Sequence, residues 1–369
     1  MSVSYGGDSI VFADGSVNSS GFIGHRNRII NGAMVIDQRN AGAAVTTNTY
    51  CPDRWRVEQT TDGAFSAQQV SDAPTGFVKS LKWTTTTADA SLAVTQYATV
   101  RQGIEGFNTA DFMWGTASAA TITISFWVKS TLTGTFGGTA SNSAFNRSYP
   151  FTYSISVANT WEYKTVTIPG DTTGTWETTN SAGIQLYFGL GSGSTYSGTA
   201  GAWTGSGLIT ATGAVNVMGT INATWQITGV QLERGSTASS FEYRPFGTEL
   251  ALCQRYYFKT FPQATAPAQN TSVYAGAISY VAVLAGANYM SAPAFFPVVM
   301  RAAPTTITFY NPGAANAKWR NGSLSTDSGN AVTNPAASQY GFLAVNNPQV
   351  SGDGINNTIY IHATAEAEL

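Results

Sequence analysis

Apolar and polar side chains alternate with a period of two along several stretches of the chain, the spacing that gives a β-strand one buried face. The longest alternation covers residues 121–129, and residues 184–190 repeat it. In residues 224–233 the alternation slips by one position at Thr228 and Gly229, which predicts a β-bulge there. We expect all three segments to be half-buried antiparallel strands. The inward-facing set of the first is Ile122, Ile124, Phe126 and Val128.

Turn-forming dipeptides separate these stretches, and the sequence between them predicts no long amphipathic helix. Many short strands joined by turns favour an all-β fold, here an antiparallel β-sandwich of the jelly-roll type. Residues 134–143 and 191–207 are rich in Gly and Ser, and we expect both to be loops at the rim of the sandwich. The clearest turns are Asn31-Gly32, Asp62-Gly63 and Pro169-Gly170.

The pattern changes after residue 245. Apolar side chains at Leu250, Cys253 and Tyr257 recur at helical spacing, so we predict one short helix over residues 248–258. Strand-like runs follow the helix, which indicates a second, smaller β domain. These runs are residues 274–284, 305–310 and 358–363.

The N-terminal region contains one short strand candidate, residues 9–13. A strand of that size cannot bury its apolar face alone, so we expect it to dock on another domain or on other copies of the chain. The whole chain then divides into an N-terminal anchoring segment (1–27), a jelly-roll domain (28–246), a connecting helix (247–258) and a C-terminal β domain (259–369).

The composition excludes several classes of protein. Only 10% of the 369 residues are charged, against about 25% in ordinary globular domains. The sequence has 18 basic and 20 acidic residues, so it lacks the basic excess that is typical of a nucleic-acid-binding protein. No run of apolar residues approaches the length of a transmembrane helix, so we expect no membrane insertion. We also expect synthesis in the cytoplasm, because the N-terminal sequence is not that of a secretion signal.

The usual catalytic and metal-binding spacings are absent from the sequence. The 2 histidines are isolated, and we predict that His362, on the strand face opposite Ile359 and Ile361, lies at a surface or interface. No pattern fixes two carboxylates together for glycoside hydrolysis. We therefore expect no enzyme activity, no cofactor and no bound metal. The carboxylates considered are Glu105, Asp111, Glu162, Asp171 and Glu177.

Carbohydrate binding is the better chemical hypothesis, because sugar rings stack on Trp and Tyr while their hydroxyls pair with polar side chains. Trp127 and Tyr187 lie on strand faces opposite the aliphatic sets, and Tyr196 and Trp203 lie in the second Gly/Ser-rich segment. We take these four as the candidate glycan-binding residues. The alternative is structural, with a neighbouring subunit covering the second face of these strands.

Two blocks of motifs flank the predicted sandwich. The opening block is NRIINGAMVIDQR at residues 27–39 and YCPDRW at 50–55. The closing block is ITGVQLERG at 227–235, FEYRP at 241–245 and ELALCQRYY at 249–257. Together they resemble tail-fibre and related virion surface proteins of tailed bacteriophages.

Further segments are consistent with this resemblance. VRQGI at residues 100–104 and ISFWVK at 124–129 are similar to strands of carbohydrate-binding-module-like jelly rolls. IVFADGS at 10–16 resembles segments near the anchoring ends of such fibres, and FPVVMRAAP at 296–304 is similar to sequence that follows the closing block.

The resemblance implies a structural protein of a phage virion, a tail fibre or receptor-binding protein that attaches to host cell-surface polysaccharide. It also implies a homotrimer in which residues 1–27 contact other virion proteins. One alternative is a head fibre or capsid decoration protein. A second alternative is a polysaccharide depolymerase.

Charges are rare in this chain, so those inside the motifs are predicted to be structural ties. We expect Glu233 and Arg244 to pair with each other or with Arg54. Asp53 and Trp55, on either side of Arg54, belong to the same predicted set.

Overall fold

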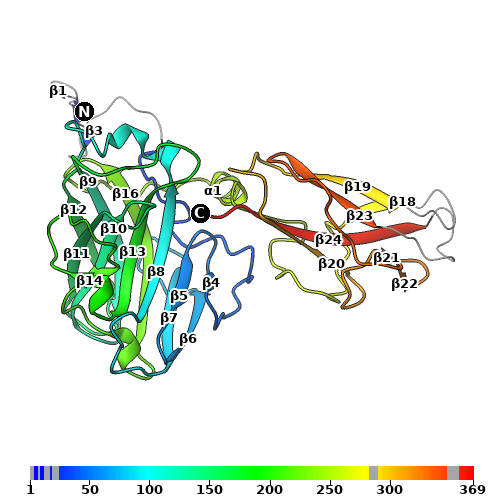
Figure 1. The fold of residues 1–369 in the computed structure, drawn as a ribbon, viewed down its shortest axis with the longest axis horizontal. Coiled ribbons are helices and arrows are strands. Elements are labelled where there is room, and N and C mark those ends of the chain that lie inside the picture. Colours follow the sequence, from blue (N-terminus) through cyan, green and yellow to red (C-terminus); the bar gives the residue numbers. More distant parts are fainter. Residues whose placement is uncertain (1–3, 7–8, 12–16, 19–24, 282–289, 347–356) are drawn as a thin grey trace.

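The prediction of an all-β fold is confirmed. A computed structural model shows one α-helix and many strands in the residues it describes. Figure 1 shows a two-sheet sandwich with a smaller β domain beside it. None of the described helices is long and apolar enough to cross a membrane. The described residues are 4–6, 9–11, 17–18, 25–281, 290–346 and 357–369.

The sandwich packs a six-stranded antiparallel sheet, in the order β11-β10-β13-β8-β5-β4, against a five-stranded one, in the order β12-β9-β16-β7-β6. The larger sheet consists of β4 (Thr49–Tyr50), β5 (Arg56–Gln59), β8 (Tyr97–Glu105), β10 (Gly134–Ser141), β11 (Ser148–Ile155) and β13 (Ala182–Ser192). The smaller sheet consists of β6 (Ala64–Val70), β7 (Ser80–Thr87), β9 (Ile122–Ser130), β12 (Glu162–Ile168) and β16 (Thr224–Arg234).

The core lies between the two sheets, as the alternation predicts. The inward-facing residues of β9 are fully buried, and Phe126 packs edge-on against Phe188 of the opposite sheet at 5.1 Å. The predicted bulge is also confirmed, because the pairing of β16 with β9 shifts register after Thr228. Gly229 has a φ of +62°, and a Cβ there would lie 2.6 Å from the Phe77 ring. The bulge therefore requires glycine.

The prediction that residues 134–143 form a loop is wrong. Most of this segment is β10, which lies between β11 and β13. A Cβ on Gly138 would lie 2.5 Å from the Phe151 ring, and one on Gly137 would lie 2.3 Å from the Thr210 hydroxyl. These glycines allow close packing on both faces of the strand. Composition alone does not distinguish a glycine-rich strand of this kind from a glycine-rich loop.

Several elements are short. β2 (Ser9–Val11) covers the start of the predicted strand 9–13, and residues 12 and 13 lie outside the described residues. It pairs with β1 (Ser4–Gly6) and β3 (Val17–Asn18). The other short elements are η1 (Gly106–Asn108), η2 (Ala110–Phe112), η3 (Ser194–Tyr196), η4 (Val217–Gly219) and the parallel pair β14 (Ser197–Gly198) and β15 (Thr210–Ala211).

The helix α1 (Phe246–Gln254) begins directly after Pro245 and ends before residue 258, where we predicted its end. It ends early because β17 (Tyr257–Lys259) pairs with β24 (Thr358–Glu366), the long strand at the centre of the second domain. β18, β20 and β21 also pair with β24. Their bounds and those of the remaining strands are β18 (Ile278–Val281), β19 (Met290–Phe295), β20 (Thr306–Tyr310), β21 (Arg320–Asn321), β22 (Thr326–Asp327) and β23 (Gly341–Asn346).

The prediction that His362 lies at a surface or interface is wrong, because its side chain is fully buried. Its ring stacks on Phe261 at 3.9 Å, and its Nε2 lies 3.0 Å from the carbonyl oxygen of Val273. Its Nδ1 lies 2.8 Å from the hydroxyl of Thr260. The segment after β17 covers the face of β24 that the alternation marked as polar.

A group of charges, the Arg–Glu cluster (Arg39, Arg54, Glu366 and Glu368), joins the two domains, and all of its side chains except Glu366 are buried. Arg54, 1% exposed, pairs with Glu368 from the end of the chain and stacks on Tyr256 at 3.5 Å. Arg39 pairs with Glu368 at 3.0 Å and with Glu366 at 3.3 Å. Each arginine therefore binds residues more than 300 positions away.

The predicted pairing of Glu233 with Arg244 is wrong. Arg244 donates to the carbonyl oxygen of Ile29 at 3.0 Å and pairs with Glu249, in the first turn of α1, at 3.4 Å. Glu233 instead accepts a 2.8 Å hydrogen bond from the backbone N–H of Ser239. Arg244 therefore ties the closing block to the opening block, whereas Glu233 holds the turn that follows β16.

The other two predicted ties hold the opening block together. The Asp53 carboxylate accepts hydrogen bonds from the backbone N–H and the side-chain amide of Gln38, at 3.1 and 2.6 Å. The indole N–H of Trp55 donates to the carbonyl oxygen of Asn31 at 3.0 Å. Both side chains are buried, so each bond replaces one to water.

We predict that Glu368→Gln lowers the free energy of unfolding by about 3 kcal/mol, because it leaves the buried Arg54 without a counter-charge. Glu366→Gln is the matched control. Its side chain is 41% exposed, so the loss should be below about 1 kcal/mol. Denaturant unfolding of the two variants measures the difference, and equal losses would contradict the dependence on burial.

A second prediction concerns pH. Burial lowers the pKa of His362 below its ordinary value of 6.5, partly opposed by the hydrogen bond to Val273. The unfolded chain therefore takes up the proton first, and this contribution to stability is full above about pH 6.5 and is lost as pH falls. His362→Gln should reduce the dependence of unfolding free energy on pH between about 7.5 and 5.5. The same dependence in wild type and His362→Gln would contradict the prediction.

Candidate functional site

The outer face of the six-stranded sheet carries a row of side chains that crosses all its strands. The pairing registers place one residue of each strand opposite the next. With neighbouring strands about 4.8 Å apart, the five gaps make the row about 24 Å long. This cross-strand row, from β4 to β11, is Tyr50, Arg56, Arg101, Tyr187, Thr139 and Pro150.

A loop packs on two glycines beside this row. A Cβ on Gly137 would lie 2.3 Å from the hydroxyl oxygen of Thr210, and one on Gly189 would lie 2.5 Å from its Cβ. The Thr210 side chain of β15 therefore packs directly on the sheet. From there the N–H of Ile209 donates to the carbonyl oxygen of Tyr196 at 2.8 Å. The loop thus places Tyr196 over the sheet.

Four aromatic rings meet at this place and form what we call the tyrosine patch (Tyr97, Phe145, Tyr187 and Tyr196). The Tyr196 ring meets Tyr97 edge-on at 5.3 Å and lies 6.2 Å from Phe145. Phe145 lies 5.7 Å from Tyr187. Tyr187 is only 6% exposed, while the other three rings are half-buried. The patch thus presents three rings to solvent and uses Tyr187 as support.

Polar side chains lie directly beside the patch. Arg101 donates to Glu58 at 2.9 Å and to the side-chain oxygen of Gln185 at 3.1 Å. The Tyr187 hydroxyl donates to the same Gln185 oxygen at 2.8 Å. Burial raises the pKa of Tyr187 above its ordinary value, so the hydroxyl keeps its proton and its role as donor. Rings and hydrogen-bonding groups therefore share one surface.

Trp203 lies elsewhere, in a cluster of three indoles. Its ring meets Trp114 at 5.2 Å and Trp176 at 5.4 Å, both edge-on. Its N–H donates to the carbonyl oxygen of Pro169 at 2.9 Å, and the guanidinium of Arg147 lies 5.8 Å from its ring. The ring also packs against the sandwich core. These contacts give Trp203 a structural role.

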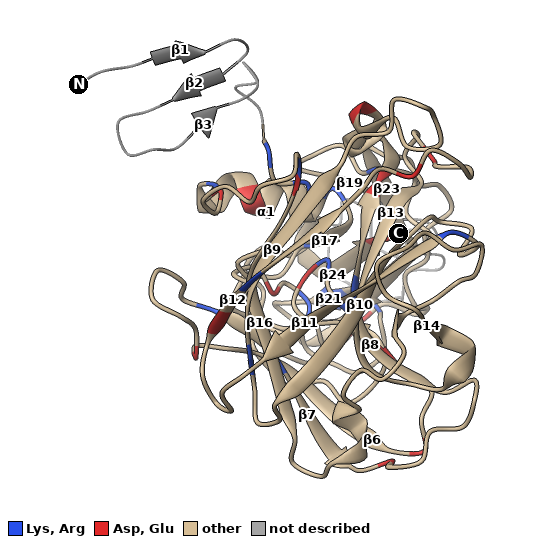
Figure 2. Cartoon of the chain, turned by 90° about the vertical axis from the view of Figure 1, so that its left-hand side faces the viewer, with Lys and Arg blue, Asp and Glu red and all other residues tan. Residues whose placement is uncertain are grey.

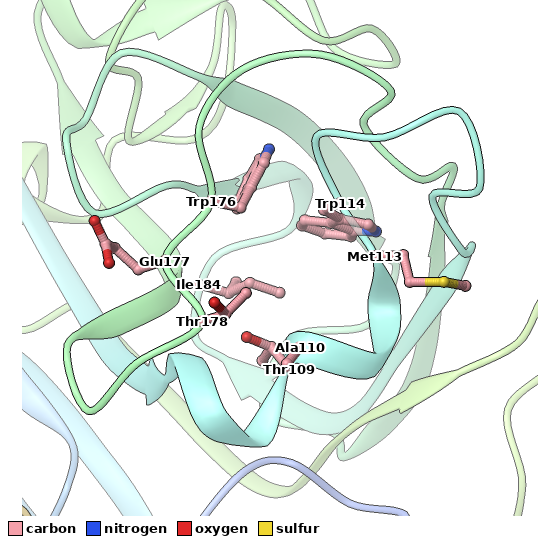
Figure 3. Close-up of a pocket in the computed structure, with 8 residues that line it drawn as sticks. All are labelled: Thr109, Ala110, Met113, Trp114, Trp176, Glu177, Thr178 and Ile184. Carbon is pink, nitrogen blue, oxygen red and sulfur yellow. The ribbon is translucent and has the colours of Figure 1, made fainter.

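The same cluster borders a small hollow of about 20 Å³. Figure 3 shows Trp114 and Trp176 beside it, with Ile184 below both rings in this view and Glu177 directed away. The two rings meet edge-on at 4.6 Å, so no sugar ring fits between them. The hollow is also smaller than the sites that hold most small ligands.

Trp127 lies on the opposite sheet. On the outer face of the five-stranded sheet its ring lies 5.4 Å from that of Tyr163 on β12. The alternation therefore gave the correct face of the strand, but not the same sheet as Tyr187. The four predicted residues occupy three separate places, and the structure brings together only Tyr187 and Tyr196.

The carboxylates considered for hydrolysis are mostly paired with cations. Burial raises the pKa of Asp171, hydrogen bonds from Arg147 lower it, and the net shift is downward. Among the described residues, no group of three or more His, Cys, Asp and Glu side chains is placed to hold a metal ion. The ion pairs are Glu105–Arg255, Asp111–Arg28, Glu162–Lys164 and Asp171–Arg147.

Sequence reasoning missed Tyr97, Arg101 and Phe145. The first two could have been found, because Tyr97 and Arg101 alternate with the buried Ala98 and Val100 on β8. Phe145 could not, since it reaches the patch from the turn between β10 and β11 and no alternation marks it.

No family model matches the sequence, and no curated protein matches it. The fold is similar to several solved structures. One is the enzymatically active domain of tailspike protein 4 of bacteriophage CBA120, at 13% identity and a TM-score of 0.31, covering 57% of this chain and 22% of that one. The chain thus spans about a fifth of that tailspike structure.

Two other similar structures are carbohydrate-binding modules. TmCBM61 in complex with β-1,4-galactotriose has 11% identity and a TM-score of 0.30, covering 57% of this chain and 99% of that one. A family 11 module from Clostridium thermocellum, in complex with a mixed-linked tetrasaccharide, has 16% identity and a TM-score of 0.26, covering 52% and 91%.

Proposed function

We propose that the protein binds glycans on the outer face of the six-stranded sheet, at the tyrosine patch. The observation that carries this proposal is the half-exposed ring pair of Tyr97 and Tyr196, beside the polar side chains of Arg101 and Gln185. Aromatic rings take the apolar C–H face of a sugar, and the polar groups take its hydroxyls.

The shape of the surface favours an extended ligand. Tyr187, Thr139 and Pro150 of the cross-strand row are buried, so its accessible part is Tyr50, Arg56 and Arg101, about 10 Å by strand spacing. Tyr97 lies about 13 Å along β8 from Arg101, and together these side chains offer contacts to more than one sugar unit. The hollow beside Trp114 is the weaker candidate. All three indole N–H groups of its cluster already donate within the protein, to Ala120, Asp171 and Pro169.

On this proposal the glycan belongs to the surface of a bacterial host, and the protein is a tail fibre or receptor-binding protein of a phage virion. The opening and closing motif blocks support this role through their resemblance to virion surface proteins. A head fibre or capsid decoration protein is the alternative within the virion.

We further propose that the protein binds without cleaving its ligand and assembles as a homotrimer, with residues 1–27 contacting other virion proteins. Four of the five carboxylates considered for hydrolysis are engaged by cations, which supports binding alone. A depolymerase would release shortened chains from a bound polysaccharide.

We predict that Tyr196→Ala weakens binding about tenfold, because a stacked aromatic ring contributes on the order of 1 kcal/mol. Binding is measured by titration with a bacterial surface polysaccharide selected on a glycan array. The melting temperature should hardly change, since the ring is half-exposed.

Two control variants separate binding from folding. Trp203→Ala should lower the melting temperature, because it opens the indole cluster, and leave the affinity of the folded protein unchanged. Tyr163→Ala, on the exposed face of the opposite sheet, should change neither quantity. Wild-type affinity in Tyr196→Ala would remove the tyrosine patch as the binding site.

The oligomeric state is tested separately from glycan binding. Mass photometry should show a species of about three times 38.8 kDa. A stable monomer at micromolar concentration would contradict the trimer while leaving the glycan-binding proposal intact.

A further inference from the structure

Two arginines lie directly opposite each other in the cross-strand row. The register pairs Arg56 of β5 with Arg101 of β8. Like charges in this position destabilise a sheet. Charged residues are few and scattered over the ribbon (Figure 2), so two arginines in register call for a physical explanation.

One carboxylate serves both arginines. Glu58 accepts from the Nε of Arg56 at 2.5 Å and from the Nε of Arg101 at 2.9 Å. The three side chains therefore carry a net charge of about +1 when all are ionised. The Arg–Glu cluster is different, because there Arg39 and Arg54 face Glu366 and Glu368 together. The excess positive charge belongs to the outer face of the sheet.

Several guanidinium N–H groups at this place are unused. Among the described residues, Arg56 donates only through Nε, and the Nη2 of Arg101 has no hydrogen-bond partner. The Arg56 side chain is 33% exposed. Aromatic rings steady both arginines, since Arg56 lies 5.7 Å from the Tyr50 ring and Arg101 5.8 Å from the Tyr187 ring. The free donors of Arg56 are thus oriented and accessible, and those of Arg101, whose side chain is 17% exposed, lie beside them.

We propose that the ligand is an acidic glycan, whose carboxylate binds Arg56 and Arg101 while a neighbouring sugar unit stacks at the tyrosine patch. This inference rests on the proposed glycan-binding function. The planar guanidinium matches a carboxylate with two parallel hydrogen bonds. Tyr97 and Arg101 are four residues apart on β8, about 13 Å by strand rise. The acidic group and the stacked ring therefore belong to different units of one chain.

The test compares bacterial surface polysaccharides that contain uronic acids with the same polysaccharides after chemical reduction of their carboxyl groups. The native form should bind at least tenfold more tightly than the reduced form. Arg56→Gln should abolish most of that difference, because it removes the accessible guanidinium. Arg234→Gln, which removes an exposed arginine at the end of β16, should preserve it.

The outcomes separate the two proposals. Equal binding of native and reduced forms, still weakened by Tyr196→Ala, would overturn the acidic-ligand inference and leave glycan binding in place. Binding of neither form, or binding that is insensitive to Tyr196→Ala, would overturn the proposed site itself. Preference for the native form that persists in Arg56→Gln would place the acid-binding group elsewhere and would also overturn the inference.

Discussion

The union of the two domains depends on buried ion pairs between Arg39, Arg54 and Glu368. A buried charge is tolerated only with a partner close by, and here the arginines come from the sandwich and the carboxylate from the end of the chain. Tyr50 adds a hydrogen bond from its hydroxyl to the carbonyl oxygen of Leu369 at 3.1 Å. The last residues of the second domain are thus part of the surface of the first.

The same contact borders the proposed binding face. Gly103 follows Arg101 by two residues on β8. A Cβ on Gly103 would lie 3.0 Å from the Leu369 side chain. On the other side of the cross-strand row, β15 rests on Gly137 and Gly189. The exposed part of the outer face is therefore defined between two covered regions. The side chains of Leu369 and Thr210, packed on glycines, set its limits, and aromatic and polar side chains occupy what remains.

The sequence predicted much of the fold, because a period of two depends only on which face of a strand is buried. It identified β9, β13, the bulge in β16 and the existence of a second β domain. It failed at β10, where Gly137 and Gly138 serve close packing in a strand. It also misjudged His362, because a strand covered on both faces has an alternation that reads as half-exposed.

The candidate site was less predictable, since alternation fixes a face but not a sheet or a partner. Tyr187 and Trp127 share a pattern and lie on opposite sheets. The tertiary fold alone brings Arg54 and Arg244 close to their ion-pair partners. The motifs therefore suggested the wrong partners for both arginines. Phe145 reaches the patch from a turn that carries no periodic signal.

The loop that carries Tyr196 has a further property. Residues 193–216 contain no Asp, Glu, Lys, Arg or His, and β15 is positioned by the shape of two glycines. Its placement therefore does not depend on ionic strength or on titration near neutral pH. If affinity for a charged ligand changes with salt, the change reports on the ligand and the arginines of the row, because the aromatic part of the surface stays where it is.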